Sequence, residues 1–84
     1  MKEFRWNKIK SEKTKQERGI SFEEVLASKF IRAEEHTSRE NQIILLYEVN
    51  GYIWVVPCIE EEEYYFVKTM FPSRKYTKKH KRGE

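Results

Sequence analysis

The residues with the clearest potential for chemistry are the cations that follow the last apolar segment of the chain. Six of the nine residues from Arg74 to Arg82 are Lys or Arg. If Ser73 caps a helix here, Arg74 and Lys75 occupy its first turn, where each cation opposes the helix dipole at a cost of roughly a few tenths of a kcal/mol. An unconstrained sequence favours acids at such positions, so this pattern predicts an anion-binding site beside the end of a strand.

Cleavage of an RNA phosphodiester is one chemistry that these residue types could support. Without a metal ion, cleavage needs a base for the 2′-hydroxyl, positive charge on the transition state and an acid for the leaving oxygen. Arg74, Lys75 and Lys68 can supply the positive charge. Glu48 or His36 can handle a proton.

Contacts to the rest of an RNA chain are expected from a second set of cationic and aromatic residues. Lys78 and Lys79 provide a diffuse positive field, and Arg5 adds a cation near the N-terminus. Tyr76 can stack on an unpaired base, as aromatic rings do in other single-strand binders. His80 lies four residues later, on the same face of a helix. The alternative is that these charges only solvate the surface.

Other familiar chemistries find no support in the sequence. A nucleophilic triad, a phosphate-cradling glycine loop and the ligand spacings of metal sites are not recognisable, so we expect no metal ion and no cofactor. The four acids from Glu60 to Glu63 are consecutive and point alternately, which is typical of a solvated turn. The single cysteine, Cys58, precludes an intrachain disulfide and suits a reducing compartment such as the cytoplasm.

The net charge of +3 conceals a division along the chain. Residues 1–20 carry seven Lys or Arg and three Glu, a net +4, and residues 64–84 carry seven and one, a net +6. Residues 21–63 carry three against ten, a net −7. A polyanion is therefore drawn to the two ends, and a basic partner to the middle. The longest apolar run, from Ile43 to Tyr47, is too short to span a bilayer, so we expect no membrane association.

The N-terminal part of the chain predicts a strand followed by a helix. Phe4 and Trp6 alternate with charged residues, which indicates a short strand with one apolar face. A polar helix is expected over 7–18. Gly19 then stands at the C-cap, where a positive φ costs glycine nothing.

A second helix is predicted to begin at a capping box, in which Ser21 and Glu24 satisfy each other's backbone amides. Apolar residues recur from Phe22 onward at i, i+3, i+4 and i+8, which predicts an amphipathic helix over 22–32. The segment 33–41 lacks apolar residues after its alanine and is expected to be a loop.

Three antiparallel strands are predicted over 42–49, 52–58 and 64–71. Asn50 and Gly51 both tolerate the positive φ of a type I′ hairpin turn, which fixes the register of the first two strands. If the acidic turn at 60–63 closes symmetrically, it fixes the register of the third strand, over 64–71, on the second. The predicted cross-strand pairs are Val49–Tyr52, Tyr47–Trp54, Leu45–Val56, Val56–Val67 and Trp54–Thr69.

Both faces of this predicted sheet are largely apolar. The first face holds Leu45, Tyr47, Val49, Tyr52, Trp54, Val56, Tyr65 and Val67. The second face holds Ile44, Leu46, Ile53, Val55, Phe66 and Met70, together with the charged residues Glu48 and Lys68. Burying an unpaired charge is costly, so the helices should cover the first face. The second face should meet a curled strand, the C-terminal segment or a partner, and its two charges are either catalytic or a plain ion pair.

At this point the chain resembles the BrnT family of bacterial toxins. The resemblance covers nearly the whole chain and is carried by an F-x-W start at Phe4, by R-G-I-S-F-E-E-V from Arg18 and by S-R-K-x-T from Ser73. It implies a RelE-like α+β fold of order β-α-α-β-β-β, with two helices on one face of an antiparallel meander. It also implies a small ribonuclease that a BrnA-type antitoxin binds and silences, with Arg74 and Lys75 on the family's C-terminal basic motif.

Two functions follow as hypotheses for what we expect to be a single domain over 1–84. The first is a metal-independent endoribonuclease toxin that cleaves mRNA and is neutralised by a cognate protein antitoxin. The second is a non-catalytic module that binds RNA or the antitoxin with a toxin-like fold. The first requires Arg74 and Lys75 to line one pocket wall. The sequence leaves open whether 77–84 is helical or disordered, and whether the protein is a homodimer.

Overall fold

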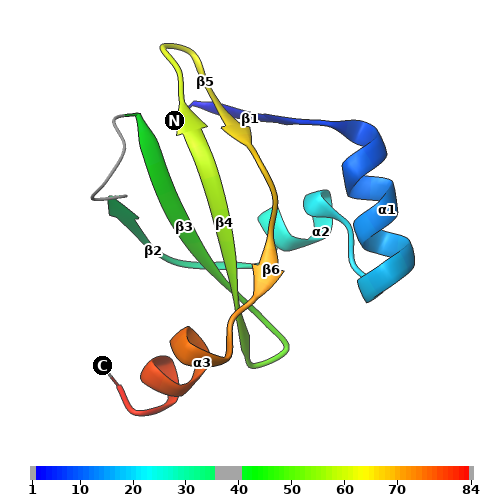
Figure 1. Cartoon of the computed structure of the whole chain (residues 1–84). Helices are drawn as coiled ribbons and strands as arrows, with labels where there is room; N and C mark the ends of the chain where they lie inside the picture. Colours follow the sequence, from blue (N-terminus) through cyan, green and yellow to red (C-terminus); the bar gives the residue numbers. More distant parts are fainter. Residues whose placement is uncertain (1, 36–40, 84) are drawn as a thin grey trace.

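The computed structural model describes residues 2–35 and 41–83, in which three helices accompany a six-stranded sheet (Figure 1). This mixed architecture confirms the predicted α+β class. None of the helices in this part of the chain has the length and apolar character needed to traverse a bilayer. The elements are β1 (Glu3–Trp6), α1 (Lys8–Arg18), α2 (Phe22–Leu26), β2 (Lys29–Glu35), β3 (Gln42–Val49), β4 (Tyr52–Glu60), β5 (Tyr64–Val67), β6 (Phe71–Pro72) and α3 (Arg74–Lys81).

The first strand and the first helix form as predicted, because their end signals are strong. The Asn7 side chain caps α1 by accepting from the Lys10 amide. Gly19 ends the helix with φ of 79°, and its amide donates to the Lys15 carbonyl. At the start of α2, both hydrogen bonds of the predicted capping box between Ser21 and Glu24 are present.

The predicted helix over 22–32 is wrong beyond its first turns, because α2 ends at Leu26 and the chain turns into β2. The Ser28 hydroxyl and the Ser28 amide both donate to the Val25 carbonyl, which closes the helix tightly. β2 then pairs antiparallel with β3, on the side of β3 away from β4, and so supplies hydrogen-bond partners for the β3 backbone there. Tertiary pairing thus overrides a helical apolar pattern. The predicted loop is also wrong over 33–35, and 36–40 lies outside the described residues.

The β3–β4 hairpin follows the predicted register. Asn50 and Gly51 have φ of 52° and 82°, the left-handed values that a type I′ turn needs. All three predicted pairs of this hairpin are present: Val49–Tyr52, Tyr47–Trp54 and Leu45–Val56.

The predicted third strand is two strands, β5 and β6, and its register is wrong. Val67 lies opposite Cys58 instead of Val56, and Trp54 lies opposite Pro72 instead of Thr69. The break falls beside Pro57, whose carbonyl accepts from the Lys68 amide but which has no N–H to continue the ladder. β1 pairs with β5 in parallel, so the strand order is β1-β5-β4-β3-β2, with β6 also on β4.

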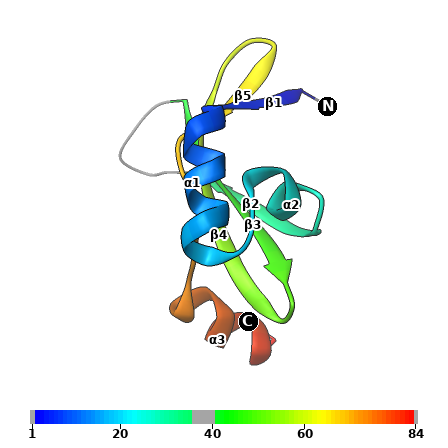
Figure 2. The same ribbon diagram turned by 90° about the vertical axis from the view of Figure 1, so that its right-hand side faces the viewer.

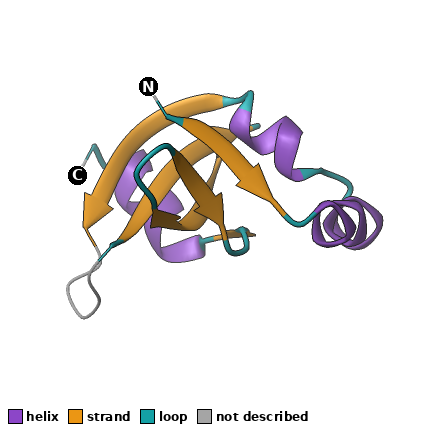
Figure 3. Ribbon diagram, turned by 90° about the horizontal axis from the view of Figure 1, so that it is seen from above, coloured by secondary structure: helices purple, strands orange, loops and turns teal. Residues whose placement is uncertain are grey.

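The strands form a curved layer with side chains buried on both faces (Figure 3). On the first face, Phe22 and Val25 of α2 pack against the main core, as predicted for this helix, whereas none of the described core residues comes from α1, which was predicted to cover the same face. Met70, predicted for the second face, joins this core because the chain leaves the ladder after Val67. The other buried members of the main core are Leu45, Tyr47, Trp54, Val56, Cys58 and Val67.

α1 lies beside α2 at one side of the sheet (Figures 1 and 2). Its link to α2 is Ser11, which is 3% exposed. The Ser11 hydroxyl accepts from the Phe22 amide at 3.0 Å and donates to the Glu23 carboxylate at 2.7 Å. This second bond is the main reason that the pKa of Glu23 lies below its ordinary value.

Candidate functional site

α3 lies against the second face of the sheet, near the β3–β4 hairpin (Figures 1 and 2). Ser73 caps the helix, as predicted, by accepting from the Tyr76 amide. The Thr77 hydroxyl, which is buried, accepts from the Ile53 amide of β4 at 2.8 Å and donates to the Ser73 carbonyl at 2.6 Å. Residues 77–81 are therefore helical, and the C-terminal segment is one cover of the second face.

Three polar side chains meet where α3 faces β2. Arg32 and Glu34 are two residues apart in β2 and therefore point to the same side of the sheet. The Tyr76 hydroxyl donates to Glu34 Oε1 at 2.9 Å, and Arg32 Nε donates to Glu34 Oε2 at 2.9 Å. Both hydrogen bonds lower the pKa of Glu34, and the bond from Tyr76 has the larger effect. The hydrogen bond to Glu34 in turn raises the pKa of Tyr76. Near neutral pH the pair is thus an ionised carboxylate and a protonated phenol.

A second pair joins His80 of α3 to Glu48 of β3, on the same face of the sheet. His80 Nε2 lies 3.4 Å from Glu48 Oε1, and both side chains are about a third exposed, at 36% and 27%. Histidine is the side chain best suited to moving protons near neutral pH, and a neighbouring carboxylate can orient its ring. Lys79 Nζ lies 6.0 Å from the centroid of the Tyr76 ring, so a cation stands beside the Tyr76–Glu34 pair.

These six residues, Arg32, Glu34, Glu48, Tyr76, Lys79 and His80, are called the α3 cluster below. Three of them, Glu48, Tyr76 and Lys79, were expected from the sequence to take part in catalysis or RNA binding. The other three were missed as site residues. Arg32 and Glu34 were hidden by the wrong assignment of β2, although their i, i+2 spacing would place them together once a strand is assumed. The signal for His80 was its spacing from Tyr76.

Arg74 and Lys75 do not line a common pocket wall. Both are exposed in the first turn of α3, as is Lys78 further along the helix. Consecutive helical residues point about 100° apart, so the two cations diverge. Neither contributes to the surface cavities that the structure forms along α1 and beside Phe30.

The other expected site residues lie away from the α3 cluster or outside the described residues. Lys68 and Glu48 were expected to meet, but Lys68 bonds beside Pro57 while Glu48 lies opposite Ile53, four residues earlier in β4. Glu48 pairs with His80 instead. His36 lies outside the described residues.

Arg5, expected to contact RNA, lies on β1 with its guanidinium 4.3 Å from the centroid of the Tyr64 ring. It also forms an ion pair of 2.6 Å with Glu3. In the structure it lies on β1, toward the opposite end of the molecule from α3 (Figure 1).

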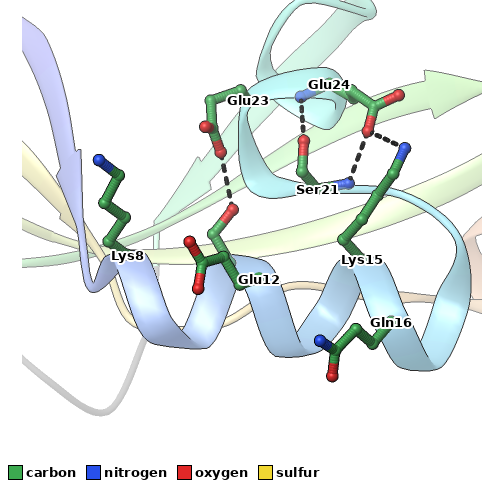
Figure 4. A pocket seen from close by; sticks show the side chains of 8 residues that line it. Lys8, Glu12, Lys15, Gln16, Ser21, Glu23 and Glu24 are labelled. Atoms are coloured by element: carbon green, nitrogen blue, oxygen red, sulfur yellow. Dashed lines mark hydrogen bonds and ion pairs between the residues drawn. The ribbon is translucent and has the colours of Figure 1, made fainter.

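Two further features carry no chemistry of their own. Burial raises the pKa of the Cys58 thiol to about 12, so this cysteine is not an activated nucleophile. The crevice between α1 and α2 is lined by charges that neutralise each other (Figure 4). There Lys15 Nζ lies 2.6 Å from Glu24 Oε1, which also accepts from the Ser21 amide.

Removing the Tyr76 hydroxyl tests the electrostatics of the α3 cluster. In Tyr76→Phe the ring is kept but Glu34 loses its strongest hydrogen bond, so the pKa of Glu34 should rise toward its ordinary value. NMR titration of the Glu34 carboxyl carbon measures this shift. Glu23, whose low pKa comes mainly from Ser11, serves as the internal control and should be unchanged. An unaltered pKa of Glu34 would mean that the Tyr76–Glu34 bond does not form in solution.

The comparison with solved structures finds a likeness to the crystal structure of the Brucella abortus ribonuclease toxin BrnT. The TM-score is 0.53 at 18% sequence identity, and the match covers 87% of this chain and 97% of that one. At this identity the likeness is one of fold, so the chain has a BrnT-like fold, as the resemblance in sequence implied. No protein-family model matches the chain. No curated protein matches it either.

Proposed function

We propose that this protein is a metal-independent endoribonuclease toxin of a bacterial type II toxin–antitoxin system, which cleaves mRNA in the cytoplasm and is neutralised by a protein antitoxin. The mechanism expected from the sequence, with Arg74 and Lys75 on one pocket wall, fails because both side chains are exposed and diverge. The proposal rests instead on a different set of groups, the α3 cluster. It gathers cations, carboxylates, a phenol and a histidine on one face of a fold shared with a ribonuclease toxin. Each requirement of RNA cleavage has a candidate group there.

The roles follow from charge and hydrogen bonding. Arg32 and Lys79 stand where they can neutralise the charge that develops on the phosphate. His80, oriented by Glu48, is the proposed base that takes the proton of the 2′-hydroxyl. The 2′-oxygen then attacks phosphorus and the bond to the 5′-oxygen breaks. The products are a 2′,3′-cyclic phosphate and a 5′-hydroxyl.

Tyr76 and Glu34 complete the set. Because the pKa of Tyr76 is raised, its phenol stays protonated before RNA binds. In the proposed step the hydroxyl turns from Glu34 to the leaving 5′-oxygen and gives it its proton, and the phenolate then regains a proton from solvent. Glu34 is a poor base because its pKa is lowered, so it acts as a positioning residue for Tyr76 and Arg32. Arg74 and Lys75, exposed on the preceding turn of the helix, are proposed to attract the RNA backbone rather than to stabilise the transition state.

The proposal is tested by incubating the purified protein with an mRNA transcript in excess EDTA. Cleavage should persist, and the fragments should carry 2′,3′-cyclic phosphate ends, because every proposed group belongs to the protein or to the RNA. Binding of RNA with a steep salt dependence but without cleavage would instead support the non-catalytic module. Cleavage that stops in EDTA and returns with a divalent cation would overturn the metal-independent mechanism.

The antitoxin part of the proposal is tested with the product of a short reading frame adjacent to the gene. That product should co-purify with this protein and stop the cleavage. The acidic middle of the chain, with a net charge of −7 over residues 21–63, would favour a partner segment that is basic.

A further inference from the structure

A second surface with RNA-binding character lies between α1 and β5. The cavity there, called the α1–β5 groove, is lined by Ile9, Lys10, Lys13, Phe66 and Lys68, together with Asn7 and Val67. Three of these residues are lysines, and none of the described residues that line the groove is acidic. Phe66 is 37% exposed and Ile9 is 76% exposed, so the lysines surround apolar surface that is open to solvent.

Phe66, one of the residues that line the groove, lies on the same face of the sheet as the α3 cluster. Phe66 pairs with Ile59 of β4, and Phe71 pairs with Val55 of the same strand. Val55 packs with Tyr76 under α3. Residues 55 and 59 are four apart in a strand, so they share a face and are separated by about 13 Å.

Two exposed aromatic rings therefore lie on this face, Phe71 beside α3 and Phe66 in the groove. Phe71 is 41% exposed beside the start of α3, and Phe66 follows further along the sheet. Arg5 pairs with Phe66 across the parallel β1–β5 ladder, and its guanidinium stacks on Tyr64. Cations interleaved with open aromatic rings are the pattern by which proteins hold single-stranded nucleic acid, the rings stacking on bases and the cations meeting phosphates.

From this arrangement we infer that the α1–β5 groove binds nucleotides of a single-stranded RNA substrate that flank the scissile phosphate held at the α3 cluster. The inference rests on the proposed function. One base stacks on Phe66, while Lys13 and Lys68 contact the backbone phosphates. Lys10 donates to the Lys68 carbonyl at 2.7 Å, which fixes α1 against the end of β5 and keeps the groove in shape.

The two cavities described earlier, between α1 and α2 and beside Phe30, do not fit a polyanion. The α1–α2 crevice is lined by three carboxylates, Glu12, Glu23 and Glu24, against two lysines, and Lys15 is already paired with Glu24, so the crevice offers a polyanion no net positive charge (Figure 4). The cavity beside Phe30 is lined by apolar residues with no cation among the described ones. Charge complementarity therefore singles out the α1–β5 groove among the three.

The experiment compares two lengths of 2′-O-methyl RNA, which lacks the attacking hydroxyl and so cannot be cleaved. Fluorescence anisotropy gives the Kd of labelled oligonucleotides of about twelve and about three nucleotides, since single-strand sites span roughly 4–16 nucleotides. Phe66→Leu keeps an apolar side chain but removes the ring, and should weaken binding of the longer RNA at least about fivefold. Lys13→Gln should lower the slope of log affinity against log salt by about 0.7. Binding of the shorter RNA should not change.

Two control variants match these changes. Tyr52→Leu removes an aromatic ring of the same 37% exposure from the other face of the sheet, and Lys15→Gln removes a cation from the other side of α1. Both should bind the longer RNA as the wild type does. Circular dichroism shows whether Phe66→Leu is folded. Lys13→Gln changes an exposed position of α1 and should fold as the wild type does, so it tests the groove even if Phe66→Leu is unfolded.

The inference is overturned if wild type and both groove variants bind the longer RNA equally, if the controls lose as much affinity, or if the longer RNA does not bind at all. These outcomes are separate from the fate of the proposed function. Loss of affinity in the groove variants from a protein that cuts no RNA would retain the groove and reject the ribonuclease. Unchanged affinity in the groove variants of a protein that still cleaves RNA would reject the groove and retain the ribonuclease.

Discussion

Replacing His80 with alanine is expected to lower the rate of RNA cleavage by roughly 10²–10⁴-fold, the usual contribution of a positioned proton-transfer group. The imidazole lies 3.4 Å from the Glu48 carboxylate on the face of α3 that also carries Tyr76. Alanine keeps the helix but removes the proposed base. The loss should appear in kcat measured under saturating RNA, because His80 is assigned to the reacting atoms rather than to general attraction of the substrate.

The matched control for this change is Lys81→Ala, which removes a neighbouring cation from an exposed position of the same helix. This variant should weaken RNA binding but leave kcat at saturating RNA close to the wild-type value. Glu48→Gln keeps the shape of the pair but removes its charge, so it should change the pH dependence of kcat. Cleavage by His80→Ala at close to the wild-type rate would remove His80 from the mechanism and leave the base unassigned.

Phe22→Ala is expected to destabilise the fold by about 3–5 kcal/mol, the range for truncating a large buried aromatic residue. Phe22 is the first residue of α2, and its side chain is fully buried in the main core. Its backbone amide donates to the Ser11 hydroxyl. A chain of this size has a free energy of unfolding of roughly 4–13 kcal/mol, so the change removes a large share of the total. α2 has five residues and is too short to form without tertiary packing.

Urea denaturation at constant temperature measures this prediction through the shift of the midpoint at unchanged slope. Phe30→Ala is the control, since Phe30 is the same residue type on the same chain but is 52% exposed. It should cost clearly less, because about half of the Phe30 side chain stays in solvent and only part of it, including its edge contact with the Tyr47 ring, is lost from packing. Equal losses in the two variants would mean that α2 is not an anchor of the main core.

The local signals were sufficient wherever a few neighbouring residues decide the backbone. Gly19 marked the end of α1 and the Ser21–Glu24 capping box marked the start of α2, since side-chain caps and a positive φ are local properties. Asn50 and Gly51 fixed the turn and with it the register of β3 on β4. A two-residue turn leaves no freedom for the pairs that follow it.

The same reasoning failed where the deciding partner is distant in the chain. Residues 29–32 were predicted to continue the helix and 33–35 to begin a loop, and only pairing with β3 makes 29–35 a strand. Pro57 could have signalled the break between β5 and β6, because a proline cannot donate to a ladder, but its effect depends on which strand lies beside it.

The candidate site shows the same division. The sequence by itself determined that cations, Tyr76 and Glu48 were available, that α3 could begin at Ser73, and that both faces of the sheet were apolar. Only the tertiary structure decided which of these groups meet, because Arg32, Glu34, Glu48 and His80 come from three separate elements. Contact between side chains far apart in sequence depends on strand order and helix placement, and both are set by packing over the whole chain rather than by any local run of residues.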